Sequence, residues 1–517
     1  MKNAVARCAA VLALALLAAQ AGAATRNIWI SQAELQSKPM SGLAWRTVDS
    51  IAHANWGSQT LGNIQPSLNN QDSKHAAKCV AGAIYYARKA NDPLSDAATI
   101  RDKVRDAILE AKRTMDEDAE YNQAVDTVLM LDATRTLGVG RQLAGYVIAA
   151  DLIDLAGLDP LSDSTIFKPW LSAITTQEFA NSNSRFGKTI VRTHESTNQW
   201  GLEIAASRTA IAAYLGNNAL LARCDSFFKA HTNQSYFPSG SVWFFPDTTV
   251  AWQGGDYFSK RPYQSTWVCT DTTSWLTISP NCLKTDAQGD TLTIDGAIVT
   301  QLSRIGSGGP ASAFAFPLDS EGINYQWTAL QQLFVQAEIL YRAGYNAYAW
   351  GSNALKRCMD VMVRAGWTGS FDNPQARMVP WMANHRYGTA YPTSEELKHP
   401  SWQMGWTDFT HAGTIQIETS PSVLAFNLNV SSNKTFTIRN VGAGTLDVTS
   451  ITVPAGKYSV SPSSATLLFN GTQAVTVSYN AGGSGSSSQL VTIASNAPGA
   501  SSVTVSCTAS GAEGEEP

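Results

Sequence analysis

The apolar positions of the chain follow two different periods, and the change from one to the other falls near residue 412. Before it, apolar residues recur three and four positions apart, which predicts amphipathic helices. Residues 235–298 lack this period and read as loops and short strands. Many antiparallel helices joined by loops favour an all-α (α/α) toroid over residues 24–412. We expect its helices over 76–90, 96–115, 122–137, 139–155, 166–176, 198–215, 219–230, 325–342 and 347–365.

Short alternating strands follow residue 412. The segments LAFNLNV, KTFTIRN, LDVTSITV, AVTVSYN, LVTIAS and SVTVSCTA alternate apolar and polar positions between turns rich in Gly, Ser, Pro and Asn. This pattern predicts an all-β immunoglobulin-like sandwich over residues 413–510, followed by a disordered acidic tail over 511–517. The succession TIRNVGAGTLDVTSI, VTVSYNAGG and VTIASNAPG resembles the ASPM–SPD-2–hydin type of immunoglobulin-like domain. That family is mostly structural or adhesive.

The N-terminus reads as a signal peptide over residues 1–23. Lys2 and Arg7 form a positive region before a short apolar run, and small residues at positions 21–23 suit cleavage. The run is too short for a stable membrane span, and no later segment reaches about 18 consecutive apolar residues. We therefore expect a periplasmic or secreted protein with no membrane span.

Net charge and aromatic content limit the classes of molecule that the protein is expected to bind. Removal of Lys2 and Arg7 changes the formal net charge from −4 to −6, and a net acidic protein has no general attraction for nucleic acid or anionic membranes. Charged residues make up only 15% of the chain, which contains 15 Trp, 16 Tyr and 17 Phe. Rings stack on sugar faces, so this composition suits carbohydrate binding. An anionic polymer would require positive charge concentrated in a cleft.

Cysteine spacing predicts neither a zinc site nor a dithiol redox centre, because the chain has no Cys-x-x-Cys pair. Export permits disulfides, and Cys269 and Cys282 bracket a polar loop, which makes them the best candidates for a bridge. The remaining mature cysteines could equally be buried free thiols. P-loop, dinucleotide-binding, His-Glu-x-x-His and Gly-x-Ser-x-Gly motifs are missing from the sequence, and we expect no metal or cofactor.

A first candidate site begins at His194, where a polar string becomes an amphipathic helix near Asn198 and Gln199. The N–H groups and the positive end of a helix dipole suit an anion. The string HESTNQWGLEI resembles the Asn-Asn-Trp or Asn-Asn-His element of alginate lyases and the Asn-x-Trp-x-x-Glu-Ile pattern of hyaluronate and chondroitin lyases. The resemblance implies that Asn198 and Gln199 neutralise a uronate carboxylate and that Trp200 stacks on a sugar. Because Trp200 stands where some members have histidine, the identity of the base is open; the alternative is a capped helix with a buried Trp200.

A second candidate site surrounds a Gly-rich loop. Toroidal alginate lyases carry Asp-Gly, then Leu-x-Arg-Gly, then a tyrosine before Ala-Leu at the start of a helix. A similar order occurs here in Asp295-Gly296, Leu302-Ser303-Arg304 and Tyr325 with Ala329-Leu330. The resemblance implies that Arg304 stabilises the carboxylate and that Tyr325 transfers the proton, across a loop longer by about a dozen residues. A phenol with a pKa near ~10 needs a nearby cation for this work. The alternative makes Tyr325 a core residue and Arg304 a surface charge.

A third candidate groups His385, Arg386 and Tyr387 on a loop that ends at Gly388. We expect this loop to form an additional wall of the cleft, with His385 as another candidate base. The aromatic residues of the segment 405–411 favour a role in sealing the domain junction instead.

Together, the resemblance to alginate lyases covers about residues 70–412 and implies β-elimination on an anionic polysaccharide that contains uronic acid. Asn198, Gln199 and Arg304 would neutralise the carboxylate. The base would be His194, His385 or Tyr325, and Tyr325 would protonate the departing oxygen. The residues that bind the substrate would be Arg192, Trp200, Trp327, Arg386 and Tyr387.

Two other functions stay open at this point. A toroidal glycoside hydrolase needs two carboxylic acids about 5–9 Å apart, and the sequence offers Glu195, Glu203, Asp319 and Glu321. A non-catalytic glycan-binding or adhesion protein would suit the immunoglobulin-like module. The sequence does not identify the uronate polymer or distinguish endo from exo cleavage.

Overall fold

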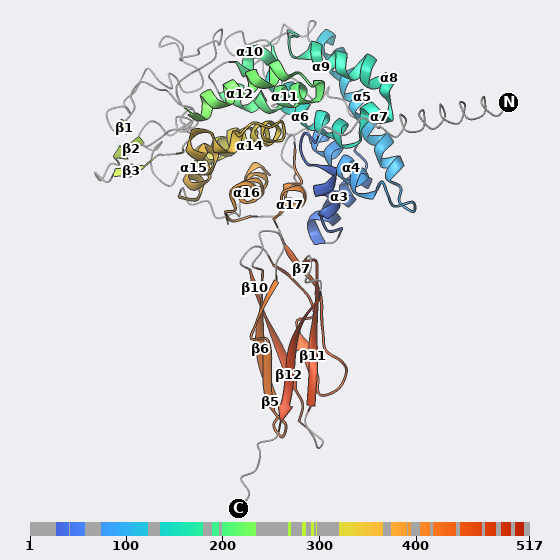
Figure 1. The fold of residues 1–517 in the computed structure, drawn as a ribbon, viewed down its shortest axis with the longest axis vertical. Helices are drawn as coiled ribbons and strands as arrows, with labels where there is room; N and C mark the ends of the chain where they lie inside the picture. The colour runs from blue at the N-terminus through green and yellow to red at the C-terminus, as the bar shows by residue number, and fades with distance from the viewer. Residues whose placement is uncertain are drawn as a thin grey trace, which may run out of the picture.

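The fold divides into a helical region and a β-sandwich, as the sequence predicts. Figure 1 shows the helices gathered at one end of an elongated molecule and the strands of the sandwich at the other. The last helix ends at Thr410, and the first strand of the sandwich begins at Ile417. The computed structural model describes residues 27–40, 42–56, 74–121, 135–178, 189–195, 199–233, 267–269, 282–285, 291–293, 296, 320–364, 374–389, 391–393, 404–413, 417–440, 445–467, 471–481, 487–497 and 502–510.

The helical region matches most of the predicted helices within a few residues. The predicted helix over 122–137 lies mostly outside the described residues, as do residues 1–23 and 511–517. The observed elements are α2 (Gln32–Ser37), α3 (Gly42–His53), α4 (His75–Lys89), α5 (Ala97–Tyr121), α6 (Arg135–Leu152), α7 (Leu155–Leu158), α8 (Pro160–Ser162), the π-helix η3 (Asp163–Phe167), α9 (Lys168–Ile174), α10 (Ile190–His194), α11 (Gln199–Leu215), α12 (Asn218–Asn233), α14 (Ser320–Arg342), the 3-10 helix η5 (Ala347–Ala349), α15 (Trp350–Arg364), α16 (Pro374–Tyr387) and α17 (Thr407–Thr410).

Helix α11 is buried between α6 on one side and α14 on the other. Gly140 of α6 lets Ile204 of α11 approach closely, because a Cβ on Gly140 would lie 2.6 Å from Ile204 Cγ2. One turn further along, the Ala144 N–H donates to Ser207 Oγ over 2.9 Å. Both contacts follow the same order along the two helices, so α6 and α11 run parallel. These contacts therefore fix the position of α11 along the axis of α6.

The sandwich consists of two sheets, with strand orders β4-β6-β10-β8 and β5-β12-β11-β7-β9. Alternate residues of each strand face the interior, as in β12, where Val505, Cys507 and Ala509 are buried and their neighbours are more exposed. The six predicted strands are confirmed as β5, β6, β7, β10, β11 and β12. The bounds are β4 (Ile417–Ser420), β5 (Val423–Asn427), β6 (Ser432–Asn440), β7 (Leu446–Thr452), β8 (Tyr458–Ser461), β9 (Ala465–Leu467), β10 (Thr472–Tyr479), β11 (Ser487–Ser495) and β12 (Ser502–Ser510).

The N-terminal helices contact both the end of the helical region and the sandwich. Lys38 Nζ donates to the carbonyl of Ala412 over 2.8 Å. Arg46 of α3 pairs with Asp447 of β7 at 3.2 Å. Gly42, which has a φ of +83°, lies so close to the sandwich that a Cβ there would be 2.9 Å from Asn496 Nδ2. This segment therefore forms the joint between the two parts.

A small antiparallel sheet, order β1-β2-β3, lies within the segment that the sequence predicts as loops and short strands. Its strands are β1 (Trp267–Cys269), β2 (Cys282–Thr285) and β3 (Thr291–Thr293). Cys269 and Cys282 are register partners on β1 and β2. Cys79, Cys224, Cys358 and Cys507 are buried and form no disulfide. The side chains of Cys269 and Cys282 lie outside the description, so the predicted bridge stays a prediction. No helix in the described part is long and apolar enough to cross a membrane.

Candidate functional site

The residues that carry the predicted chemistry are only partly described. Asn198 and Arg304 lie outside the described residues. Gln199 and Trp200 occupy the first two positions of α11, and Tyr325 lies in the second turn of α14. Their side chains are outside the description as well. The predicted convergence of amides, guanidinium and phenol on one sugar acid therefore stays a prediction.

A buried charged cluster lies directly before α11. Its members are His194, Glu195, Arg208 and Arg223, which we call the Glu195 cluster. Glu195 follows the last residue of α10, and its carboxylate accepts from Arg223 Nε at 2.5 Å and Arg223 Nη2 at 2.6 Å. Arg208 Nη1 lies 2.8 Å from the same carboxylate. One carboxylate therefore joins α10, α11 and α12 next to the start of α11.

The surroundings fix the charge of each group in this cluster. Burial acts to raise the pKa of Glu195, but hydrogen bonds and charge from Arg223 and Arg208 outweigh it and hold the pKa below its ordinary value. Burial, followed by the charge of Arg208, lowers the pKa of His194 well below its usual range. Arg208 Nη1 lies 3.4 Å from His194 Nδ1. A guanidinium only donates, so Nδ1 is the acceptor and the ring proton sits on Nε2.

The position of His194 favours a structural role over the predicted catalytic one. Its side chain is fully buried, and Nε2 has no hydrogen-bond partner among the described residues. A base must reach the proton that it removes and must have a suitable pKa. A buried imidazole with a lowered pKa meets neither requirement.

Two predicted substrate-binding residues differ in their access to solvent. Arg192 is exposed on α10, one turn before Glu195, and its side chain is available to a ligand. Trp327 on α14 is 0% exposed and belongs to the hydrophobic core. The burial of Trp327 favours packing over the predicted stacking on a sugar.

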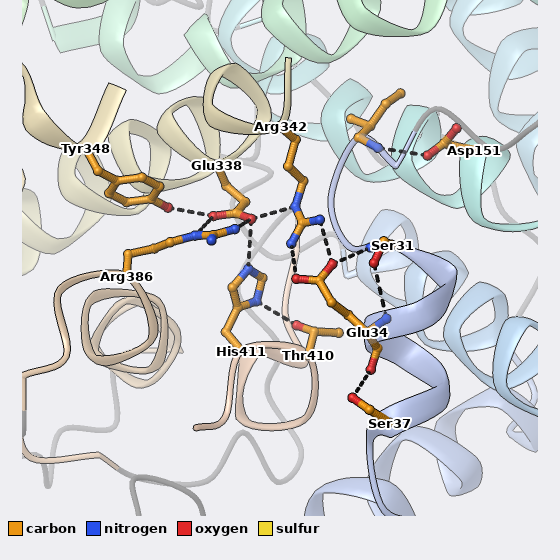
Figure 2. Close-up of polar contacts among 11 residues, drawn as sticks. Ser31, Glu34, Ser37, Asp151, Glu338, Arg342, Tyr348, Arg386, Thr410 and His411 are labelled. Carbon is orange, nitrogen blue, oxygen red and sulfur yellow. Dashed lines mark hydrogen bonds and ion pairs between the residues drawn. The ribbon is translucent and has the colours of Figure 1, made fainter. Parts of the chain in front are cut away.

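A second buried cluster surrounds Glu338 on α14 (Figure 2). We call Glu338, Arg342, Tyr348, Arg386 and His411 the Glu338 cluster. Arg342 Nε and Arg386 Nε approach the carboxylate at 2.6 Å and 2.7 Å. The Tyr348 hydroxyl donates over 2.9 Å, and His411 Nε2 lies 3.7 Å away. Burial acts to raise the pKa of Glu338, but His411 and Arg386 outweigh it and hold the pKa well below its usual value.

The Glu338 cluster also reaches the N-terminal helix α2. Arg342 Nη1 and Nη2 donate to the Glu34 carboxylate over 2.8 Å and 3.0 Å. Glu34 in turn completes a capping box with Ser31 at the start of α2. This cluster was not predicted, although two charged residues four positions apart in the apolar run LQQLFVQAEILYR were a signal. The cluster ties the first described helix to α14, α16 and the end of α17.

The prediction of a loop over 384–388 is wrong. His385, Arg386 and Tyr387 form the last turn of α16, and Gly388, with a φ of +62°, follows the helix end. Arg386 is bound to Glu338, and the Tyr387 hydroxyl donates to the Tyr348 carbonyl over 2.7 Å. These contacts favour a structural role for both residues rather than the predicted contacts with sugars.

His385 is half-buried beside the Glu338 cluster. Burial, then the charges of His411 and Arg386, lower the pKa of His385 to about 3. The ring packs edge-on against His411, with 5.5 Å between ring centroids. A neutral imidazole with so low a pKa is a weak base at neutral pH. Across the described residues, no group of three or more His, Cys, Asp or Glu side chains is arranged to hold a metal ion.

The family comparison concerns the C-terminal module. Residues 425–510 match the family model described as HYDIN/CFA65/VesB-like, Ig-like domain, which confirms the immunoglobulin-like prediction. A Porphyromonas gingivalis protein of unknown function is similar at 24% identity and a TM-score of 0.18, over 19% of this chain and 47% of that chain. The ASH/PapD-like domain 7 of human CEP192 is similar at 13% identity and a TM-score of 0.17, over 20% of this chain and 89% of that one. The chain thus spans about half of the first of these proteins. No curated protein sequence matches it.

Proposed function

We propose that the chain is an exported polysaccharide lyase that cleaves a polymer containing uronic acid by β-elimination. In this proposal the helical region is an α/α toroid, residues 1–23 are removed on export to the periplasm or the medium, and no cofactor takes part. The observation that carries the proposal is the Glu195 cluster, where two arginines share one buried carboxylate at the start of α11.

Local charge supports an anionic substrate at this place. The chain has a formal net charge of −4, yet residues 180–230 contain six basic residues against three acidic ones. Of the acidic residues, Glu195 is bound by two arginines and Asp225 pairs with Lys229 at 2.6 Å. The positive end of the α11 dipole adds to this field. A polyanion that carries a carboxylate on each sugar would be attracted to a segment with this excess of positive charge.

The state of Glu195 argues against this residue as the general acid of a hydrolase. A glycoside hydrolase needs one carboxylic acid that is protonated at neutral pH. Two guanidiniums hold the pKa of Glu195 below its ordinary value, so this carboxyl stays ionised. Among the other candidate acids, Asp319 and the side chains of Glu203 and Glu321 lie outside the described residues.

The reaction would proceed as follows. Asn198, Gln199 and Arg304 neutralise the carboxylate of the sugar, which makes the C5 proton more acidic. Because both candidate histidines are buried or half-buried with lowered pKa values, we assign the base to Tyr325. The phenolate takes the C5 proton, the electron pair forms the C4–C5 double bond, and the C4–oxygen bond breaks. The same phenol then protonates the departing oxygen. Arg192 and Trp200 would hold neighbouring sugars.

A panel of uronic-acid polymers tests the proposal. The purified chain without residues 1–23 is incubated with each polymer, while ultraviolet absorbance reports unsaturated uronate products. We expect absorbance to rise with at least one polymer. The rate of this rise should be about a hundredfold lower for Arg304→Ala, since one charge-stabilising donor contributes about 3 kcal/mol. New reducing ends without absorbance would identify a hydrolase instead. Binding without any fall in polymer viscosity would identify a glycan-binding protein.

We also propose that exported protein carries a disulfide between Cys269 and Cys282. Facing residues of antiparallel strands have Cα atoms about 4.5–5.5 Å apart, which lies inside the range of about 4.4–6.8 Å that disulfides require. The two cysteines are such partners on β1 and β2. Peptide mass mapping without reduction should recover the linked pair, and recovery of both as free thiols from oxidised protein would refute the bridge.

A further inference from the structure

We propose that the chain forms a reversible dimer, in which the outer face of one sheet of its sandwich packs against the same face of a second copy. The sheet is the one with strand order β5-β12-β11-β7-β9. The sandwich projects away from the helical region, which contacts it at Asp447 and Asn496 (Figure 1). The proposal concerns the sandwich alone, so it stands or falls separately from the proposed cleavage reaction.

The outer face of this sheet carries small, uncharged side chains on three neighbouring strands. Alternate residues of β5, β12 and β11 point outward, because the residues between them fill the core. All outward residues on these three described strands are Ser, Thr, Ala, Asn, Val or Leu. A partner that covers them therefore removes no charge from water, which would be costly. Those of the central strand β12 are Ser502, Thr504, Ser506, Thr508 and Ser510.

One row across this face carries two exposed apolar side chains. Ser506 of β12 is the register partner of both Val423 on β5 and Leu490 on β11. Val423 is 53% exposed and Leu490 is 50% exposed. Neighbouring strands lie about 4.8 Å apart, so the two apolar side chains flank Ser506 about 10 Å from each other. Burial of both against another surface would be favourable.

A second copy is the occupant whose chemistry matches this face. A polyanion such as the proposed substrate requires basic side chains, and a sugar face requires aromatic ones. The described outward residues of β5, β12 and β11 include neither kind. The same face on a second copy brings no charge that would be buried without a partner. A two-fold axis between the faces, along β12 through Ser506, places Val423 of each copy over Leu490 of the other.

The size of the face sets the strength of the dimer. Strand β12 has 9 residues, which span about 30 Å, and four strands cover about 19 Å across the sheet. The face therefore offers about 500 Å² per copy, or about 1,000 Å² in a dimer, which is below the standard size of a stable interface. We expect a weak dimer in exchange with the monomer.

The other sheet of the sandwich provides a matched control. Its outward residues also include Ser and Thr, but Glu418 and Arg439 add an exposed ion pair at 3.9 Å. Thr476 on β10 and Thr492 on β11 are equivalent positions on the two faces. Each is half-buried, lies on an inner strand of its sheet and stands between two fully buried residues. Lysine at either position adds the same charge, but only Thr492→Lys adds it to the proposed contact.

Sedimentation velocity on the chain without residues 1–23, over micromolar to sub-millimolar concentrations, gives the Kd of the dimer. We expect Leu490→Lys and Thr492→Lys to raise Kd by at least about tenfold, since each dimer would then bury two unpaired charges. Thr476→Lys should leave Kd within about twofold, because its charge stays in water. The Tm of each variant reports whether the fold is kept.

Oxidative cross-linking locates the contact independently of affinity. Two copies of Ser506 meet on the proposed axis, so Ser506→Cys should give a disulfide-linked dimer. Thr437→Cys on the other sheet should give no more linked dimer than the unsubstituted chain.

The remaining outcomes overturn the proposal. They are a chain that stays monomeric throughout the concentration range, and a dimer whose Kd is unchanged in both Leu490→Lys and Thr492→Lys. Cross-linking through Thr437→Cys but not through Ser506→Cys would place the contact on the other sheet. A Kd that rises strongly between about 0.1 M and 1 M salt would show that charged groups hold the copies together, and the uncharged face would then not be the contact.

Discussion

Arg386 and Glu338 form a buried ion pair across 48 positions of the chain, with Arg386 Nε donating to Glu338 Oε2 over 2.7 Å. The carboxylate is 0% exposed, and the arginine side chain is 12% exposed. Arg386 also stacks over the ring of Tyr341 at 4.2 Å. The pair fastens α16 to α14, and through Arg342 and Glu34 it fastens both to α2. Figure 2 shows how these side chains converge from elements far apart in sequence.

Removal of one partner from this pair should destabilise the helical region strongly. Arg386→Met leaves the buried Glu338 carboxylate with less compensating charge, and such losses cost about 3–5 kcal/mol. The free energy of unfolding from urea titration measures the effect. Arg105→Met provides the control, because the ion pairs of Arg105 within the described part of the chain are with the more exposed Asp102 and Asp106. Such a surface pair contributes about 0–1 kcal/mol, so equal losses in the two variants would contradict the prediction.

The buried histidines should make the fold sensitive to acid. Burial lowers the pKa of His75 to about 3, and those of His231 and His411 to about 4, whereas an unfolded histidine titrates near ~6.5. Between these values the unfolded chain binds more protons, so stability rises with pH. His53 acts in the opposite sense, since its neighbours Asp49 and Asp96 outweigh burial and raise its pKa, but it is largely exposed. We therefore expect Tm to fall as pH is lowered from about 6.5 toward 4.

A single substitution checks the origin of this dependence. His231→Gln removes one group with a lowered pKa, so the fall in Tm between about pH 6.5 and 4 should become shallower than in the unsubstituted chain. His53→Gln serves as the control and should not flatten the curve. Identical slopes for the His231→Gln variant and the unsubstituted chain would contradict the assignment.

The spacing of apolar residues along the chain predicted most of the helices and strands. The periods of three to four residues found α6 and α11, and the alternation of LVTIAS and SVTVSCTA found β11 and β12. Helix α16 was missed because Pro380 and the terminal Gly388 interrupt its signal. Two partners of Glu338 could not be predicted from the sequence for a different reason. Tyr348 is 10 positions away and Arg386 is 48 positions away, so only the fold brings them together. The burial of His194 and Trp327 is likewise a property of packing, not of sequence spacing.

The joint between the two parts should depend on Gly42 more than on the ion pair beside it. Any other residue at Gly42 would adopt a φ of +83° and press its Cβ against Asn496, which costs about 1–3 kcal/mol. The Arg46 side chain is 59% exposed, and such pairs contribute about 0–1 kcal/mol. Calorimetry should therefore show a larger loss for Gly42→Ala than for Arg46→Ala. The reverse order would show that α3 and the sandwich do not meet as described.

The close approach of α6 and α11 leads to a prediction that couples packing to the site. A Cβ on Gly140 would lie 2.6 Å from Ile204 Cγ2 and 2.8 Å from Ile204 Cβ. A β-branched side chain has little freedom to turn away, so Gly140→Ala should push the helices apart at a cost of about 1–3 kcal/mol. Ile204 lies five positions after Gln199, and the displacement should reach the first turn of α11.

A double-mutant cycle separates this contact from general damage to the core. Ile204→Ala alone should cost about 2–5 kcal/mol through the cavity that it leaves. Combined with Gly140→Ala, the loss of Ile204 Cγ2 removes the 2.6 Å contact, while the 2.8 Å contact with the Cβ at position 204 remains. Because part of the clash is relieved, the double variant should be more stable than the sum of the single losses by at least about 0.5 kcal/mol. Ile211, also buried on α11 but two turns away, supplies the control. Its replacement by alanine should add to Gly140→Ala without coupling. Additive losses at Ile204 would mean that Gly140 does not set the distance between the two helices.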